Sequence, residues 1–198
     1  MTELLPTKSS FKPDEAIEIE VRGSVAPGRV RVWHLGDLVA EQPYDGSGLV
    51  RLPGLPAGGY AVEAGELRTA IDVRRNLRDR LRYGFVASFG PDKDTGGVSD
   101  TVRRLHLNGV MFYDWAYRHA DLMGGGETYR DPLDQPISLP TVRALIKAVQ
   151  AAGSRAIGYA AVYAVGPKEW EGWKHRALLK ADGAPYGLGD FLFILDPA

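Results

Sequence analysis

The runs that decide the predicted fold read YGFVASF at residues 83–89, GVMFY at 109–113 and AIGYAAVY at 156–163. Each run is almost entirely apolar, as in strands that are buried on both faces of a sheet. Segments with helical periodicity lie between them, at residues 99–107 and at residues 142–149. Apolar strands that alternate with helices in this way predict βαβ units around a parallel sheet.

The helix predicted around residues 142–149 has a start and a stop signal. Ser138 is its predicted N-cap, because a serine hydroxyl accepts a hydrogen bond from a free backbone amide, and Gly153 is its stop. Residues 83–198 hold three βα units and a final apolar run, FLFIL at 191–195, whereas a complete (β/α)8 barrel needs about 250 residues. We therefore predict the first three to four βα units of an incomplete TIM barrel; an open α/β layer also fits this length.

The first part of the chain follows a different pattern, in which apolar and polar residues alternate at every second position. Such stretches occur at residues 16–21, 29–33, 37–40, 48–52, 60–64 and 70–73. They are separated by turn residues and predict six or seven antiparallel strands in an all-β immunoglobulin-like sandwich. We place this domain at residues 1–78 and the α/β barrel portion at residues 79–198.

The composition excludes several classes of protein. The 198 residues carry 24 Lys+Arg against 25 Asp+Glu, without the basic excess of a nucleic-acid-binding protein. There is no cysteine, and the four histidines are too scattered for a metal pair, so we predict neither metal nor cofactor. No run approaches the ~18 apolar residues of a membrane span, and no signal peptide is visible. We expect a cytoplasmic protein, or a secreted one if its N-terminus was processed, without nucleic-acid or membrane partners.

The densest cluster of side chains capable of binding or chemistry is FYDWAYRH at residues 112–119. It follows the second apolar strand, at the end where α/β proteins bind ligands. Asp114 can accept hydrogen bonds from sugar hydroxyls, Arg118 and His119 can donate them, and Trp115 and the tyrosines can stack on a sugar ring. The alternative is that some of these rings only fill space between strand and helix.

Three other features have simpler interpretations. Tyr163 ends the third apolar run and would lie at the same end of a parallel sheet. Trp170 and Trp173 are expected to pack the following helix onto the sheet, because such large rings are usually buried. The run of glycines at 124–126 lacks the strand-to-helix position and the Lys-Ser/Thr of a phosphate-binding loop, so we predict a flexible loop.

Four stretches resemble, in the family's order, the start of the catalytic barrel of glycoside hydrolase family 66, the dextranases and cycloisomaltooligosaccharide glucanotransferases. They are RYGFVASF at 82–89, LHLNGVMFYDWAYRHADL at 105–122, YRDPLDQPISLPTV at 129–142 and GYAAVYAVG at 158–166. FLFILDPA at 191–198 completes the order. An immunoglobulin-like domain precedes the barrel in that family too.

The resemblance implies action on α-1,6-glucan or isomaltooligosaccharides by a retaining mechanism. In that mechanism one carboxylate attacks the anomeric carbon and a second protonates the leaving oxygen. Because both come from later barrel strands in the family, the resemblance places them beyond Ala198 and assigns no catalytic residue here. The substrate-binding residues that it implies are Tyr113, Asp114, Trp115, Arg118, His119 and Tyr163.

Three features depart from the family's pattern. Family enzymes are typically exported, yet no signal peptide is visible. Residues 131–135 read DPLDQ where the family usually has Asp-Pro-Leu-Gly-Arg, which puts any contact of that Gly-Arg pair in doubt. The barrel expected here would lack its second half, and with it the catalytic carboxylates that the resemblance implies.

The last apolar run predicts an unpaired sheet edge, because the chain ends soon after it at Asp196-Pro197-Ala198. This favours an N-terminal fragment that is inactive alone and able to self-associate through that edge. The alternatives are a non-catalytic carbohydrate-binding or interaction module, and an enzyme that acquires its missing strands from a partner chain. If the chain were active, Asp114 and Asp196 would be the carboxylate pair to consider, since both follow strands at the same end.

Overall fold

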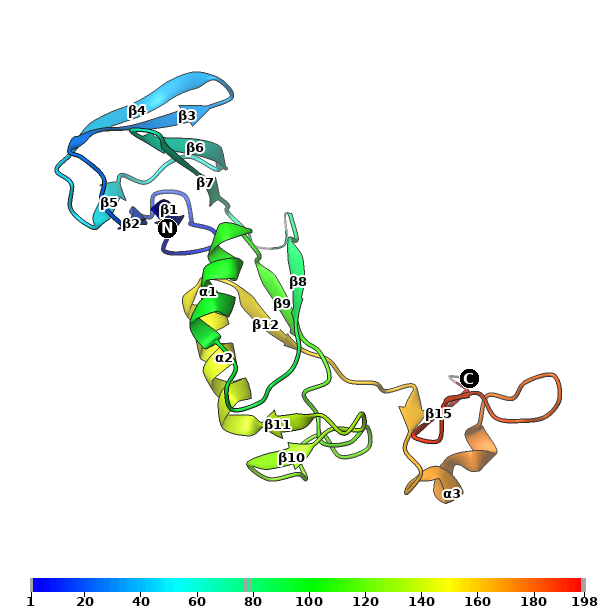
Figure 1. The fold of residues 1–198 in the computed structure, drawn as a ribbon. Coiled ribbons are helices and arrows are strands. Elements are labelled where there is room, and N and C mark those ends of the chain that lie inside the picture. The colour runs from blue at the N-terminus through cyan, green and yellow to red at the C-terminus, as the bar shows by residue number, and fades with distance from the viewer. Residues whose placement is uncertain (1, 77, 79, 197–198) are drawn as a thin grey trace. The chain divides into compact units, whose positions relative to one another are not determined.

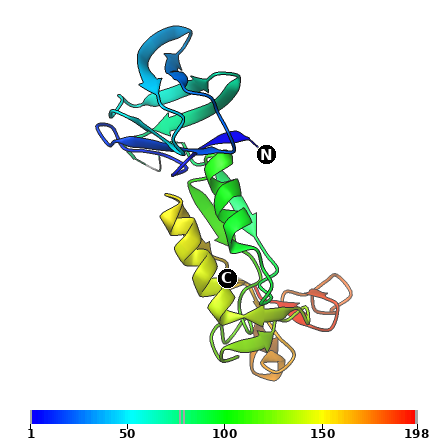
Figure 2. The ribbon, with the colours of Figure 1, turned by 60° about the vertical axis from the view of Figure 1, so that its left-hand side comes forward.

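The structure is a computed structural model that describes residues 2–76, 78 and 80–196, shown as a ribbon in Figures 1 and 2. The chain divides into two compact units. Unit 1 comprises Met1–Phe85, Asp94–Met111 and Leu145–Ile157; unit 2 comprises Val86–Lys93, Phe112–Ala144 and Gly158–Ala198. The domain boundary expected between residues 78 and 79 stays a prediction, and residue 79 lies outside the described residues.

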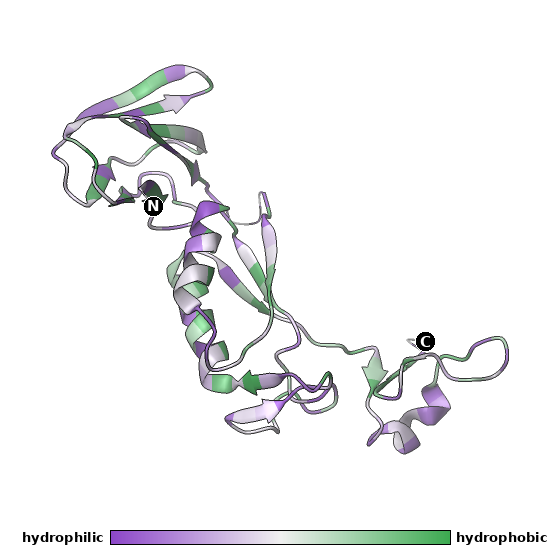
Figure 3. Ribbon diagram, viewed as in Figure 1, coloured by the Kyte–Doolittle hydropathy of each residue, from purple (hydrophilic) through white to green (hydrophobic). Residues whose placement is uncertain are grey.

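Two antiparallel sheets in unit 1 are built from the alternating stretches. One has the strand order β1-β2-β5, with bounds Glu3–Pro6, Ile17–Arg22 and Leu49–Leu52. The other has the order β4-β3-β6-β7, with bounds Asp37–Tyr44, Gly28–His34, Gly58–Ala64 and Leu67–Val73. Successive strand residues point to opposite faces, so Ile17, Ile19, Val30, Val32 and Val62 are fully buried. In Figure 3, hydrophobic and hydrophilic residues alternate along these strands in the same way.

A third sheet has the order β12-β9-β8, with bounds Arg155–Gly158, Gly109–Phe112 and Tyr83–Val86. Helix α1 (Thr95–Arg104) joins β8 to β9, and α2 (Leu139–Ala151) precedes β12. The backbone nitrogen of Asn108 donates to Arg82 O at 3.0 Å, and that of Tyr113 donates to Val86 O at 2.9 Å. Hydrogen bonds that advance in the same direction along both strands define parallel pairing.

The helix ends follow from local chemistry. Asp94 caps α1 by accepting a hydrogen bond from Gly97 N at 2.9 Å, so this helix begins before the predicted residue 99. Ser138 Oγ accepts from Thr141 N at 3.3 Å at the start of α2. Gly153, just beyond its end, has a φ of +79°, a conformation that glycine adopts without strain. The predicted cap and stop of this helix are confirmed.

Unit 2 contains two further antiparallel sheets. The hairpin of β10 (Thr128–Arg130) and β11 (Pro136–Ser138) precedes α2. The other sheet has the order β13-β15-β14, with bounds Ala164–Val165, Leu192–Ile194 and Gly187–Leu188. Between β13 and β14 lie helix α3 (Trp170–Trp173) and the 3-10 helix η1 (Lys174–Arg176).

The predicted fold class, an immunoglobulin-like sandwich followed by three to four βα units of a (β/α)8 barrel, is wrong. The described residues form small sheets, mostly with antiparallel pairing, and only three α-helices. The run at residues 156–163 ends as a strand at Gly158, and the run at 191–195 joins a separate antiparallel sheet instead of the parallel one. Apolar runs indicate which residues are buried, but they do not specify the pairing of strands distant in sequence.

The unpaired edge predicted at residues 191–195 is also wrong. β15 is the central strand of its sheet: Phe193 lies opposite Val165 of β13 and opposite Gly187 of β14. Its backbone groups are therefore paired on both sides, and the argument for self-association through this strand loses its basis. Pro197 and Ala198 lie outside the described residues. None of the helices described has the length and apolar character needed to cross a membrane.

Candidate functional site

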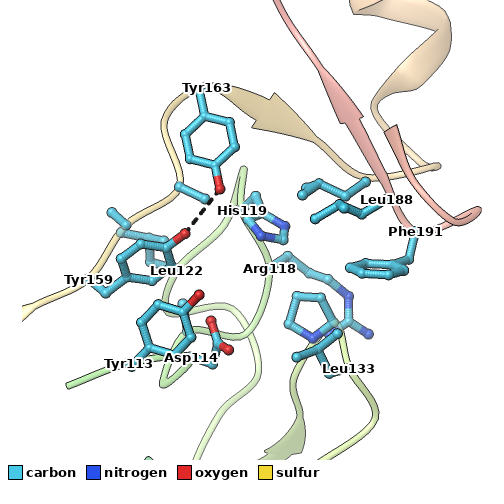
Figure 4. A pocket seen from close by; sticks show the side chains of 15 residues that line it. Tyr113, Asp114, Arg118, His119, Leu122, Leu133, Tyr159, Tyr163, Leu188 and Phe191 are labelled. Atoms are coloured by element: carbon cyan, nitrogen blue, oxygen red, sulfur yellow. Dashed lines mark hydrogen bonds between the residues drawn. The ribbon is translucent and has the colours of Figure 1, made fainter. Parts of the chain in front are cut away.

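A cavity of about 110 Å³ lies in unit 2, where several loops converge (Figure 4). We call it the tyrosine pocket. Its walls come from the segment after β9, the segment after β12, the turn between β10 and β11, and the β14–β15 hairpin. The lining residues are Tyr113, Asp114, Ala116, Arg118, His119, Leu122, Pro132, Leu133, Tyr159, Ala160, Ala161, Tyr163, Leu188, Phe191 and Leu192.

Three tyrosines form one side of the tyrosine pocket. The rings of Tyr113 and Tyr159 lie 4.6 Å apart between centroids and are tilted by 38°. The hydroxyls of Tyr159 and Tyr163 are hydrogen-bonded at 3.2 Å, as the dashed line in Figure 4 shows. This hydrogen bond, together with burial, raises the pKa of Tyr159. The pocket therefore offers aromatic surface with hydroxyl groups at its edge.

Asp114 provides the carboxylate of the tyrosine pocket. Its φ is +54°, in the left-handed region that aspartate and asparagine adopt more readily than most side chains. Burial raises the pKa of Asp114, and the negative charge of Asp131 adds to this, while His119 opposes it. A carboxylate that is partly removed from water gains from a hydrogen-bond donor supplied by a ligand.

Arg118 and His119 lie across the tyrosine pocket from the three tyrosines (Figure 4). Arg118 Nη1 donates to the backbone oxygens of Tyr117 at 2.5 Å and Arg130 at 2.7 Å, and its guanidinium lies 4.2 Å from the Tyr117 ring centroid. These contacts fix its position. Burial lowers the pKa of His119, although Asp114 and Glu169 oppose the effect. A neutral imidazole has one donor and one acceptor nitrogen.

Trp115 does not line the tyrosine pocket. Its Nε1 donates to Tyr159 O at 3.0 Å, and its backbone oxygen accepts from the Tyr129 hydroxyl at 2.5 Å. Trp115 thus holds together the segments that carry Asp114 and Tyr159, which is a supporting position. Whether it also contacts a ligand stays a prediction.

Gly125 gives the glycine run a structural role. The rings of Tyr117 and Tyr129 pack edge to face, with centroids 5.6 Å apart. A Cβ atom at Gly125 would lie 2.5 Å from Tyr129 Cγ and 2.7 Å from Tyr117 Cδ2. The glycine is therefore needed for close packing beside the pocket, a role that the prediction of a flexible loop did not include.

The structure brings together most of the predicted substrate-binding residues, since Tyr113, Asp114, Arg118, His119 and Tyr163 all line the tyrosine pocket. Their binding role itself stays a prediction. Asp196 is not among the lining residues, so the geometry gives no support to its pairing with Asp114.

The two tryptophans near the site differ. Trp170 stacks on Phe193 of β15, with ring centroids 4.4 Å apart, as a packing residue does. Trp173 is 48% exposed, so the expectation that it is a packing residue is wrong.

Sequence reasoning missed several residues of the tyrosine pocket. Tyr159 was not among the predicted binding residues, although in an unbroken strand residues 159 and 163, four positions apart, would point to the same face. β12 ends at Gly158, so both tyrosines lie in the segment after the strand. Leu188 and Phe191 reach the pocket through the β14–β15 hairpin, and no local pattern places that hairpin here. Among the described residues, no group of three acidic or histidine side chains is arranged to hold a metal ion.

Comparisons with known proteins extend these observations. The model of glycosyl hydrolase family 66 matches residues 55–186. Two cycloisomaltooligosaccharide glucanotransferases of Niallia circulans are each 28% identical to this chain. One match, over 192 residues, covers 79% of this chain and 19% of the relative; the other, over 160 residues, covers 70% and 16%.

A solved structure is also similar. It is the crystal structure of a Paenibacillus sp. cycloisomaltooligosaccharide glucanotransferase complexed with cycloisomaltoheptaose. It matches with a TM-score of 0.73 and 25% identity, over 99% of this chain and 34% of that one. The chain thus spans about a third of the solved relative and less than a fifth of the curated relatives that it matches.

Proposed function

This chain belongs to glycosyl hydrolase family 66, and we propose that it forms the saccharide-binding part of an enzyme that acts on α-1,6-linked glucans. The observation that carries the proposal is the tyrosine pocket, in which aromatic rings from two segments of the chain converge with a carboxylate. The similar solved protein was crystallised with cycloisomaltoheptaose, which supports a saccharide as the ligand.

Each group in the tyrosine pocket has a distinct part in the proposed binding. The rings of Tyr113 and Tyr159 offer apolar faces against the C–H face of a sugar ring. Asp114 accepts hydrogen bonds from sugar hydroxyls, and a hydrogen bond to a charged acceptor is stronger than one between neutral groups. His119, in its neutral form, donates one hydrogen bond and accepts another. A few placed polar groups within an apolar wall are typical of small-ligand sites.

The proposal assigns binding, and not bond cleavage, to this pocket. Retaining glycosidases need two carboxyl groups about 5–5.5 Å apart, one as nucleophile and one as acid and base. The described lining of the tyrosine pocket contains one carboxylate, Asp114. We therefore propose that Asp114 orients the saccharide, and we assign the retaining chemistry of the family to no residue of this chain.

Isothermal titration of the 198-residue chain with isomaltotriose tests this proposal. Asp114→Asn retains the local backbone preference but loses the charged acceptor, so we expect about tenfold weaker binding, in line with the value of a charge-assisted hydrogen bond. Asp121→Asn is the matched control. Asp121 is exposed, its Oδ1 accepts from Gly124 N at 2.9 Å, and it does not line the pocket. The control is expected to bind as the wild type does.

Three results would contradict the proposal. Absence of isomaltotriose binding by the wild-type chain would remove its basis. Release of reducing sugar from dextran by this chain, abolished in Asp114→Asn, would show that the pocket itself cleaves glycosidic bonds. Equal affinity for maltotriose, whose linkages are α-1,4, would contradict the proposed preference for α-1,6-linked glucan.

A further inference from the structure

A tyrosine outside the tyrosine pocket, Tyr129, is hydrogen-bonded to the segment that carries Asp114. Its hydroxyl donates to Trp115 O at 2.5 Å, and Trp115 follows Asp114 directly in the chain. All three residues belong to unit 2. Among the described residues, neither Tyr129 nor Trp115 lines the pocket. Tyr129 therefore acts on a bound saccharide through the residues that it holds.

The position of Tyr129 is fixed by its own neighbours. It lies in β10 directly opposite Ile137 of β11, which is 3% exposed. Its ring packs edge to face on the Tyr117 ring, with centroids 5.6 Å apart. The backbone nitrogen of Ser138, in the same hairpin, donates to Phe89 O at 2.9 Å. The hairpin is thus a fixed support from which the Tyr129 hydroxyl extends.

The backbone of Asp114 adopts a conformation that its surroundings must stabilise. Its φ is +54°, in the left-handed region, which costs free energy for a residue with a side chain and persists where neighbouring contacts fix it. The next residue, Trp115, is fixed at two points: its backbone oxygen accepts from Tyr129, and its Nε1 donates to Tyr159 O at 3.0 Å. A residue held in this way restrains the backbone of its neighbour, and with it the direction of the Asp114 carboxylate.

The hydroxyl is the one group that distinguishes Tyr129 from a phenylalanine. A phenylalanine ring would keep the contact with Tyr117 and the place opposite Ile137, but it would lack the donor to Trp115 O. Burial, together with the negative charge of Asp131, raises the pKa of the Tyr129 hydroxyl. A raised pKa favours the protonated form, which is the donor. The hydrogen bond to the Trp115 backbone is therefore what a tyrosine specifically contributes here.

We propose that Tyr129 is a positioning residue, whose hydroxyl directs the Asp114 carboxylate into the tyrosine pocket by fixing Trp115. This inference rests on the proposed saccharide binding. A carboxylate that is already held in its binding position loses less conformational freedom when the ligand binds, so the affinity is higher. Without the Tyr129 hydroxyl, the ligand itself has to order Asp114, and binding weakens.

Titration of the whole chain with isomaltotriose, comparing the wild type with Tyr129→Phe, tests the inference. We expect about threefold to tenfold weaker binding, in line with the cost of ordering one group on binding. Tyr60→Phe is the matched control. The hydroxyl of Tyr60, in β6, also donates to a backbone oxygen, that of Pro56 at 2.8 Å. This variant loses a similar hydrogen bond, yet its affinity should equal that of the wild type.

A double-mutant cycle shows whether Tyr129 acts through Asp114. Asp114→Asn lacks the charged acceptor, so the addition of Tyr129→Phe to it should weaken binding by less than about twofold. The same loss of affinity with and without Asp114→Asn would assign to Tyr129 a general support of the pocket and would overturn the inference. An unchanged affinity of Tyr129→Phe, when the wild type binds, would overturn it as well.

A measurement without ligand separates this inference from the proposed function. In Tyr129→Phe the released carboxylate of Asp114 should turn towards water, and its pKa should fall towards that of an ordinary aspartate. The charges of Asp131 and His119, which also act on this pKa, are the same in both chains. Nuclear magnetic resonance of the carboxyl carbon follows the titration. If the wild type binds no isomaltotriose, the proposed function fails, and the titration still decides: a lowered pKa supports the role of Tyr129, and an unchanged pKa overturns it.

Discussion

Most apolar side chains are buried in the N-terminal sheets, β1–β7, whereas several in the walls of the tyrosine pocket are exposed. In the N-terminal sheets, Ile17, Ile19, Val30, Val32 and Val62 are all 0% exposed. Around the tyrosine pocket, Tyr163 is 47% exposed and Leu188 56%, although both line it. Val162, next to Tyr163, is 88% exposed.

The difference shows where stability and binding come from in this chain. Burial of apolar surface contributes about 25 cal/mol per Å², and the buried apolar residues of the N-terminal sheets form one core cluster. The pocket walls leave apolar and aromatic surface uncovered beside a partly desolvated carboxylate, Asp114. Such surface is available to a ligand. The N-terminal sheets therefore resemble a structural core, and the pocket walls resemble a binding surface.

The largest expected effect tests the interpretation of the N-terminal sheets as a structural core. Ile19→Ala removes a fully buried side chain of β2 and should lower the free energy of unfolding by about 2–5 kcal/mol. Leu38→Ala is the control, because Leu38 of β4 is 48% exposed, and its effect should stay within about 0.5 kcal/mol. Urea denaturation measures both. Similar losses in the two variants would contradict the assignment of the core.

A smaller effect tests the packing that supports the tyrosine pocket. Gly125→Ala forces a Cβ against the Tyr129 and Tyr117 rings and should cost about 1–3 kcal/mol, as overpacking does. Because Tyr129 holds the Trp115 backbone, isomaltotriose binding should weaken as well. Gly172→Ala, in α3, is the matched control, since nothing lies within 4 Å of the added Cβ. Thermal unfolding and titration of both variants compare them; a Gly125→Ala variant as stable as the control would contradict this packing.

The smallest expected effect tests the interpretation of the tyrosine pocket as a binding surface. Burial raises the pKa of Asp114 in the fold above its unfolded value, so the unfolded chain releases this proton first as the pH rises. The free energy of unfolding therefore falls as the pH rises through the pKa that Asp114 has in the folded chain, and the full loss is present at neutral pH. Asp114→Asn does not titrate at this position. It should be more stable than the wild type at pH 7 by a fraction of a kcal/mol, while it binds saccharide less well.

The pH dependence of the stability difference between Asp114→Asn and the wild type tests the direction of this prediction. The stability gap between Asp114→Asn and the wild type should close as the pH falls towards the ordinary pKa of an aspartate. Urea denaturation at a series of pH values measures the gap. A gap that widens on acidification would mean that the fold stabilises the charged form of Asp114, contrary to the effect of its burial.

Local patterns in the sequence anticipated those features that depend on neighbouring residues. The Ser138 cap and the Gly153 stop of α2 were predicted from residue type alone and are confirmed. The motifs at residues 82–166 indicated the family, which the family match confirms. Such features require only a few consecutive residues to adopt one backbone conformation, so the sequence contains all the information that they need.

The errors of prediction have one physical origin. The run at residues 191–195 was expected to extend a parallel sheet, but β15 pairs with β13 and β14 instead. An apolar strand can satisfy its hydrogen bonds against any suitable neighbour, and its own side chains do not say which one it meets. The fold class failed for this reason, although many of the buried residues were correctly expected.

By itself, the sequence determined the alternating core of the N-terminal sheets, the ends of α2, the cluster at residues 112–119 and the family. Only the tertiary structure decided that Tyr159, Leu188 and Phe191 meet this cluster and that the Asp131 carboxylate is buried beside it. The features determined by the sequence depend on residues a few positions apart, whose spacing sets which face they share. The features decided by the tertiary structure depend on contacts between distant segments, which form only when the whole chain packs.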